Sequence, residues 1–142
     1  MINFFKKEEE QRIIAAIGEA EAQTSGEIRV HLQKGFKGKV EDAAAKTFAR
    51  LRMDRTADRN GVLIFIVPSR QQFAIIGDKG IHEKVPPNFW QDVRDVMQHH
   101  FRDGKYADGV CEGVLLAGQK LKEHFPWQSD DVNELPDEIS YG

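Results

Sequence analysis

The run Gly61-Val62-Leu63-Ile64-Phe65-Ile66-Val67 constrains the fold of this chain more than any other segment. It has no charged or polar side chain, so a β-strand formed by it has no face that prefers water. A strand buried on both faces lies inside a sheet that helices cover on both sides. The run therefore predicts an α/β fold of three layers, with this strand in the middle of the sheet.

Neighbouring segments predict the rest of the sheet and its helices. Residues 27–33 alternate between apolar and polar side chains, which is typical of a strand with one buried face, and residues 72–76 predict a third strand. Apolar residues at helical spacing predict helices over residues 7–24, 40–53, 88–101 and 107–124. The first two strands are joined through a helix and are expected to be parallel with a right-handed crossover. The third strand follows a short turn and is expected to be antiparallel to the second.

The length of 142 residues fits one domain, which we place at residues 1–125. The remaining residues, 126–142, contain no Lys or Arg and are predicted to form a disordered tail. The acidic residues of this tail are Asp130, Asp131, Glu134, Asp137 and Glu138.

Composition excludes several classes of protein. The single cysteine, Cys111, excludes an intrachain disulfide, and no apolar run approaches the ~20 residues of a membrane-spanning helix. The net charge of −3, without a basic stripe, argues against nucleic-acid binding. We expect a cytoplasmic monomer without membrane insertion. His31, on the polar side of the first strand, is expected to be exposed, and no P-loop or His-Glu-x-x-His zinc pattern is present.

The predicted strand directions bring three distant loops to one end of the sheet. The first two strands begin there and the antiparallel third strand ends there, so Glu27, Asp58, Asn60 and Asp78 should share one rim. Carboxylates that lie close together repel one another unless a positive charge lies among them. The rim is therefore a candidate metal site for Ca²⁺ or Mg²⁺, hard ions that prefer oxygen ligands.

Two other interpretations of the rim stay open. A basic side chain could neutralise the carboxylates in place of a metal, and the nearby candidates are Arg29, Arg55, Arg59 and Lys79. The acidic residues could also be ordinary turn and capping residues, as Asn60-Gly61 and Asp78-Lys79-Gly80 suggest. Residues 56–61 are similar to the beginning of a twelve-residue EF-hand loop. The first position of that loop would be Thr56 and the twelfth Val67, neither of which is the acidic ligand that an EF-hand requires, so the segment is not an EF-hand.

A second dense cluster of turn and charge signals covers residues 101–109, between the last two predicted helices. It is either a simple corner between helices or a loop that supplies a carboxylate or a cation to a cleft.

Three segments together resemble the TPM domain family, and the resemblance extends from about Glu9 to Phe125. These segments are Asn60-Gly61-Val62-Leu63-Ile64, Phe73-Ala74-Ile75-Ile76-Gly77-Asp78-Lys79-Gly80-Ile81 and Phe101-Arg102-Asp103-Gly104-Lys105-Tyr106-Ala107-Asp108-Gly109.

The resemblance implies an α/β/α sandwich with about four mostly parallel strands, and Ca²⁺ binding. It also implies acid phosphatase activity, which is described for thylakoid-lumen members, and a protein partner of the membrane-associated LemA type. The positions carried over from the family are Asn60, Asp78 and Asp103. The chain departs from the family pattern before Asn60-Gly61, where Arg59 replaces an acidic residue.

Three functions follow as hypotheses. The favoured one is a non-enzymatic domain that binds Ca²⁺, or Mg²⁺, through Glu27, Asp58, Asn60, Asp78 and Asp103 and interacts with a protein partner. The alternative is a phosphomonoester hydrolase in which a cation at Asp58, Asn60 and Asp78 polarises a phosphoryl oxygen. The third is a purely structural or assembly protein that contacts its partner through the acidic tail or the loop 34–39.

Overall fold

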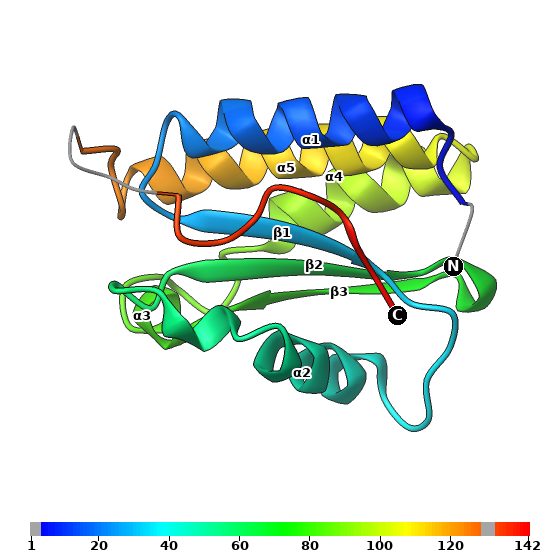
Figure 1. Cartoon of the computed structure of the whole chain (residues 1–142), viewed down its shortest axis with the longest axis horizontal. Helices are drawn as coiled ribbons and strands as arrows, with labels where there is room; N and C mark the ends of the chain where they lie inside the picture. The colour runs from blue at the N-terminus through cyan, green and yellow to red at the C-terminus, as the bar shows by residue number, and fades with distance from the viewer. Residues whose placement is uncertain (1–3, 129–132) are drawn as a thin grey trace.

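A computed structural model describes residues 4–128 and 133–142 of the chain. Its sheet has four strands in the order β3-β2-β1-β4, and Figure 1 shows α1, α4 and α5 on one face and α2 on the other. The strands are β1 (Glu27–Leu32), β2 (Gly61–Val67), β3 (Gln72–Gly77) and β4 (Ser140–Tyr141). The α-helices are α1 (Lys7–Glu21), α2 (Val40–Arg50), α3 (Lys79–His82), α4 (Gln91–Arg102) and α5 (Tyr106–Lys122). This architecture confirms the predicted α/β fold.

The central strand β2 is buried along its whole length, as its sequence predicts. Val62, Ile64 and Ile66 pack into the larger core beneath α1, α4 and α5. Leu63, Phe65 and Val67 point to the smaller core beneath α2. Because successive side chains of a strand alternate between faces, β2 joins the two cores into one structure.

The strand directions also agree with the prediction. β1 is parallel to β2, with Glu27 opposite Gly61, and β3 is antiparallel to β2, with Gly77 opposite Val62. The connector expected after β3 differs from the prediction, because it begins with the short helix α3, whose N-cap is Asp78.

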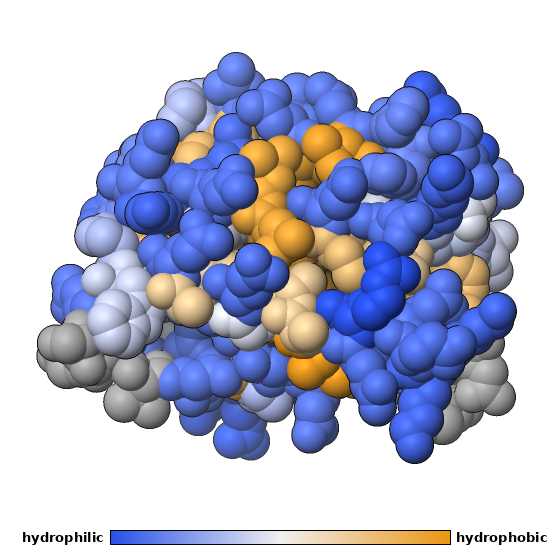
Figure 2. Space-filling model, turned by 90° about the horizontal axis from the view of Figure 1, so that it is seen from above, coloured by the Kyte–Doolittle hydropathy of each residue, from blue (hydrophilic) through white to orange (hydrophobic). Residues whose placement is uncertain are grey.

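The outer surface of the larger helical layer is mostly hydrophilic, and an apolar strip crosses it (Figure 2). This distribution is typical of helices that bury one face against a sheet. Within the described residues, no helix is long and apolar enough to span a membrane.

The prediction of a disordered tail is wrong for residues 133–142. Leu135 and Ile139 are buried in the two cores, and Ser140–Tyr141 form β4, which pairs in parallel with His31 and Leu32 of β1. Residues 129–132, including Asp130 and Asp131, lie outside the described residues. The segment 133–142, which we call the C-terminal segment, therefore belongs to the folded domain.

The C-terminal segment also explains why the prediction of an exposed His31 is wrong. His31 is fully buried, with Nδ1 2.6 Å from the Ser140 hydroxyl and Nε2 2.8 Å from the Gln33 amide oxygen. Its ring stacks on Phe65 at 5.5 Å between centroids. Burial lowers the pKa of His31, because removal from water disfavours the charged imidazolium.

Candidate functional site

The three predicted loops meet at one end of the sheet, which is the left end in Figure 1. The backbone N–H of Glu27 donates to the Asn60 carbonyl at 3.2 Å, and that of Asp78 donates to the Gly61 carbonyl at 2.9 Å. We call this end, with Glu27, Asp58, Asn60 and Asp78, the rim. The backbone geometry of the rim is thus the predicted one, whereas its side chains point to different partners.

Asp78 is bound by Arg59. The guanidinium donates through Nε to Oδ2 at 2.8 Å and through Nη2 to Oδ1 at 2.9 Å, and the backbone N–H of Lys79 donates to Oδ1 at 2.7 Å. Asp78 is 6% exposed, while the Arg59 side chain is 45% exposed. Both carboxylate oxygens are therefore occupied by a bidentate ion pair of the kind that Arg forms best. Among the four cations considered from the sequence, Arg59 neutralises Asp78.

The loops that carry these two residues are locked together. The Gly80 N–H donates to the Arg59 carbonyl at 2.9 Å, and a Cβ atom on Gly80 would lie only 2.3 Å from the Asp58 carbonyl oxygen. Only glycine allows so close an approach of two backbones. Arg59 itself has a left-handed backbone, with φ of 50°, which costs a non-glycine residue about 1–2 kcal/mol. The close packing of the two loops therefore holds Arg59 opposite Asp78.

Asn60 and Asp58 have different roles at the rim. Asn60 is 1% exposed and its side-chain amide donates to the Ser25 carbonyl at 3.2 Å, which ties the loop before β1 to the start of β2. Its backbone N–H donates to the Thr56 hydroxyl at 3.2 Å. Asp58 is exposed. The position of Asn60 is thus explained by the bonds that hold these two loops.

Asp103, which the family resemblance adds to the predicted ligands, does not lie at the rim with the other four. It caps the C-terminal end of α4, next to Arg102 and Gly104, which line a cavity with Ile66 and Val67 at the far end of β2. The prediction placed Asp103 by the family motif alone, and the direction of α4 carries it to the opposite end of the sheet.

Glu27 lies in the most unusual environment of the rim. It is 3% exposed; its Oε1 accepts a hydrogen bond from the Leu135 N–H at 2.6 Å, and its Oε2 has no hydrogen-bond partner among the described residues. Burial raises the pKa of Glu27 to about 7; the backbone N–H groups of Leu135 and Glu134 oppose this rise, and the neighbouring carboxyl of Glu134 adds to it. A buried carboxylate oxygen without a partner carries a large desolvation cost, which a proton or a cation can relieve.

A second carboxyl pair lies beside Glu27 and was missed from the sequence. Burial raises the pKa of Glu21 to about 9, and a hydrogen bond with Asp137 adds to the shift. Glu21 also accepts a hydrogen bond from the Ile28 N–H at 3.0 Å. A cavity of about 250 Å³ adjoins Glu21, Glu27 and Asp137. The sequence signal for this pair is the group of acidic residues in the C-terminal segment. A segment predicted to be disordered has no defined position, so the pair does not follow from the sequence.

The predicted set of five ligands does not fit one metal ion. Asp78 is occupied by Arg59, the Asn60 amide is bonded to Ser25, and Asp103 is at the other end of the sheet. Within residues 4–128 and 133–142, no group of three or more His, Cys, Asp or Glu side chains is arranged to hold a metal ion. Of the five, only Glu27 has a buried oxygen that lacks a partner in the same residues. A cation would therefore have to bind at Glu27, with water or backbone oxygens completing its coordination.

Comparison with known proteins places this geometry in a family. The family model of the TPM domain matches residues 2–120. The NMR structure of the BA42 protein from the psychrophilic bacterium Bizionia argentinensis is 44% identical to this chain, covers 100% of it and 98% of its own chain, and superposes with a TM-score of 0.95.

Two further solved structures show the same fold at lower identity. The N-terminal domain of a protein from P. gingivalis is 23% identical, with a TM-score of 0.69 over 87% of this chain and 80% of that one. The N-terminal domain of cg2496 from Corynebacterium glutamicum is 12% identical, with a TM-score of 0.65 over 96% of this chain and 80% of that one. A search of curated proteins finds no match. The match over residues 2–120 and the likeness to BA42 show that this chain belongs to the TPM domain family.

Proposed function

We propose that this chain is a cation-dependent binding domain, in which Ca²⁺, or less favourably Mg²⁺, binds at Glu27 and fixes the C-terminal segment as part of a surface for a protein partner. The observation that carries the proposal is the buried Oε2 of Glu27, which has no partner in the described part of the chain. Glu134, whose carboxyl raises the pKa of Glu27, is the second proposed ligand. Two carboxylates with water and carbonyl oxygens suit the oxygen preference of Ca²⁺.

Proton release should accompany cation binding. Because burial raises the pKa of Glu27 to about 7, a cation at neutral pH must displace a proton from a large fraction of the molecules. Cation affinity should therefore increase as the pH rises through about 7.

The partner surface would consist of the bound segment itself. Glu134 accepts a hydrogen bond from the Ala57 N–H at 3.1 Å, and Leu135 bonds to Glu27, so a cation here would tie the C-terminal segment to two loops of the rim. The LemA-type partner implied by the family resemblance stays a prediction.

An amide NMR titration of the full chain with CaCl₂, and separately with MgCl₂, tests the proposal at pH values below and above 7. We expect saturable shifts around Glu27, Glu134 and Leu135 that strengthen at the higher pH and disappear in Glu27→Gln. Asp58→Asn, which changes an exposed rim carboxylate, is the matched control and should bind as the parent does. Absence of saturable shifts at millimolar cation, or equal binding by Glu27→Gln, would exclude the site.

The alternative function, a phosphomonoester hydrolase, is favoured by one observation at the rim. Arg59 uses Nε and Nη2 for Asp78, and its side chain is half-exposed. A guanidinium in this position suits a phosphate oxygen. Hydrolysis of p-nitrophenyl phosphate, with and without Ca²⁺ or Mg²⁺, tests this function. Activity of the parent that is lost in Arg59→Gln would support it, and activity no higher than that of a blank purification would reject it.

A further inference from the structure

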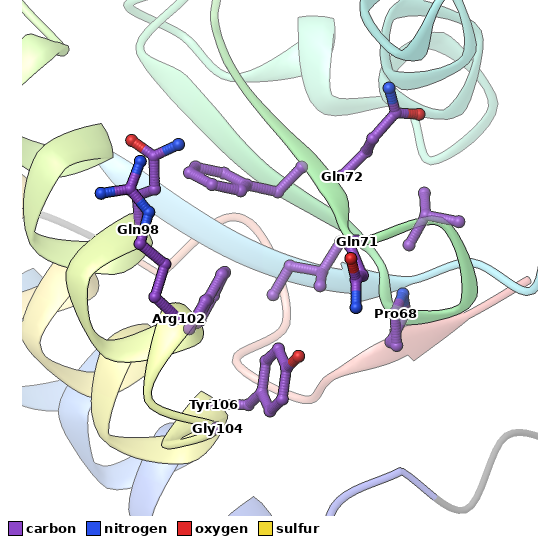
Figure 3. Close-up of a pocket in the computed structure, with 11 residues that line it drawn as sticks. Pro68, Gln71, Gln72, Gln98, Arg102, Gly104 and Tyr106 are labelled. Atoms are coloured by element: carbon purple, nitrogen blue, oxygen red, sulfur yellow. The ribbon is translucent and has the colours of Figure 1, made fainter.

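A cavity of about 440 Å³ lies at the end of the sheet opposite the rim, between the β2–β3 turn and the C-terminal end of α4 (Figure 3). Its size is within the range of pockets that bind small molecules. Apolar side chains form much of its wall, and three polar side chains complete it. The apolar side chains include Ile66, Phe73, Phe101 and Tyr106, and the polar ones are Gln71, Gln98 and Arg102.

The polar side chains of this cavity are free to bind a ligand. Gln71, Gln98 and Arg102 make no side-chain hydrogen bond or ion pair with the residues that the structure describes. In Figure 3, Gln98 and Arg102 lie together on the α4 side, and Gln71 faces them from the β2–β3 turn. The Tyr106 hydroxyl points into the space between these two walls. Such an arrangement presents several unused donors to one small volume.

The charge of the lining favours an anion. Among the described residues that line the cavity, Arg102 is the only charged one, and none is Asp or Glu. A guanidinium binds a carboxylate through two parallel hydrogen bonds, and the amide groups of Gln71 and Gln98 can donate further ones.

The aromatic residues of the cavity favour a flat apolar group on the same ligand. Phe73 and Phe101 meet edge to face at 5.3 Å between centroids, and Phe101 and Tyr106 lie tilted at 5.1 Å. Aromatic pairs of this kind offer both edges and faces for contact with another ring.

The backbone at Gln71 supports a role beyond packing. Gln71 is exposed and has a left-handed conformation, with φ of 52° and ψ of 40°. Glycine adopts this conformation without the cost that glutamine pays. A strained residue at the edge of a cavity is a feature of binding sites, where a side chain is kept despite its backbone cost.

We propose that this cavity binds a small organic carboxylate with a flat apolar body, such as an arylacetate, with Arg102 holding the carboxylate and Phe73, Phe101 and Tyr106 contacting the ring. The site is separate from the rim, so its failure would leave the proposed cation site unaffected. It also gives a role to the segment 101–109, which supplies Arg102 as the cation of a cleft.

Titration of the full chain with phenylacetate, followed by amide NMR, tests the proposal. We expect saturable shifts confined to residues 66–73 and 98–106. Benzyl alcohol, which lacks the charge, and acetate, which lacks the ring, should each bind at least about tenfold more weakly. Benzyl alcohol loses the charge-assisted hydrogen bonds, and acetate loses the burial of the apolar ring.

Arg102→Gln and Arg94→Gln form a matched pair of variants. Both arginines lie on α4, but only Arg102 lines the cavity. Arg102→Gln should weaken phenylacetate binding about tenfold or more, and Arg94→Gln should leave it unchanged. The proposal is overturned if the parent chain shows no saturable shifts, if benzyl alcohol binds as tightly as phenylacetate, or if the two variants weaken binding equally.

Discussion

The two ends of the sheet differ in how their polar side chains are used. At the rim, Asp78 and Asn60 are buried and bonded to Arg59 and Ser25. At the opposite end, Gln98 and Arg102 line a cavity and have no such partner among the described residues. Glu27 is the exception at the rim, because one of its buried oxygens is unpaired within the same residues.

This difference separates residues that maintain the fold from residues that are available to ligands. A buried polar group that is fully bonded costs free energy when its partner is removed, whereas an exposed group without a partner can be changed at little cost. Substitutions at the two ends should therefore have opposite signatures, with stability affected at the rim and binding affected at the cavity.

The largest expected effect on stability is that of Asp78→Ala. It removes both bonds to Arg59 and the bond from the Lys79 N–H at the N-cap of α3, and should lower the free energy of unfolding by about 2–3 kcal/mol. Arg102→Ala, at the cavity end, should change it by less than about 0.5 kcal/mol. Urea denaturation followed by circular dichroism measures both, and similar losses for the two variants would contradict the comparison.

The next effect is the pH dependence of stability that Glu27 introduces. Its pKa is raised from 4.5 to about 7 in the folded chain, so the folded state binds more protons than the unfolded state between these values. The stability contributed by the protonated carboxyl is fully present below about pH 4.5 and is lost as the pH rises through about 7.

Glu27→Gln removes this titration and keeps an acceptor for the Leu135 N–H. In the presence of a chelator, the variant should match the parent near pH 4 and exceed its free energy of unfolding by about 2 kcal/mol near pH 8. Glu19→Gln, at an exposed position on α1, serves as the control and should follow the parent at both pH values. Parallel curves for Glu27→Gln and the parent would contradict the raised pKa.

The smallest effect is expected for Gln71→Gly at the cavity. Relief of the left-handed backbone should gain about 1 kcal/mol, and the greater freedom of glycine in the unfolded chain should cancel roughly half of it. The free energy of unfolding should thus rise by about 0.5 kcal/mol while phenylacetate binding weakens. A clear loss of stability would show that the Gln71 side chain supports the fold. The cavity end would then resemble the rim, where polar side chains maintain the fold.

The backbone of the rim could be predicted because it depends on few sequence features. The apolar run 61–67 requires a central strand, and the connections on either side set the directions of β1 and β3. These directions place Glu27, Asn60 and Asp78 at one end whatever the exact strand boundaries. Side-chain partners do not follow from strand directions, and the pairing of Asp78 with Arg59 was one of several alternatives.

The contributions of residues beyond 126 could not be predicted in the same way. β4 is only two residues long, and its parallel pairing with β1 joins residues 109 positions apart in sequence. The composition around it is acidic and carries little strand signal, although Leu135 and Ile139 are buried. A prediction of disorder for this segment provides no partner for His31 or Glu21, so the burial of His31 and the pairing of Glu21 with Asp137 do not follow from the sequence either.

The docking of β4 has a consequence for how this domain meets other molecules. Without it, the outer margin of β1 would offer unsatisfied amide and carbonyl groups next to an imidazole that is otherwise sealed from solvent. An exposed strand edge of this type is a template for pairing with another extended polypeptide, including a further copy of the same chain. Because β4 pairs with His31 and Leu32, the chain's own residues close this part of the β1 edge to such pairing.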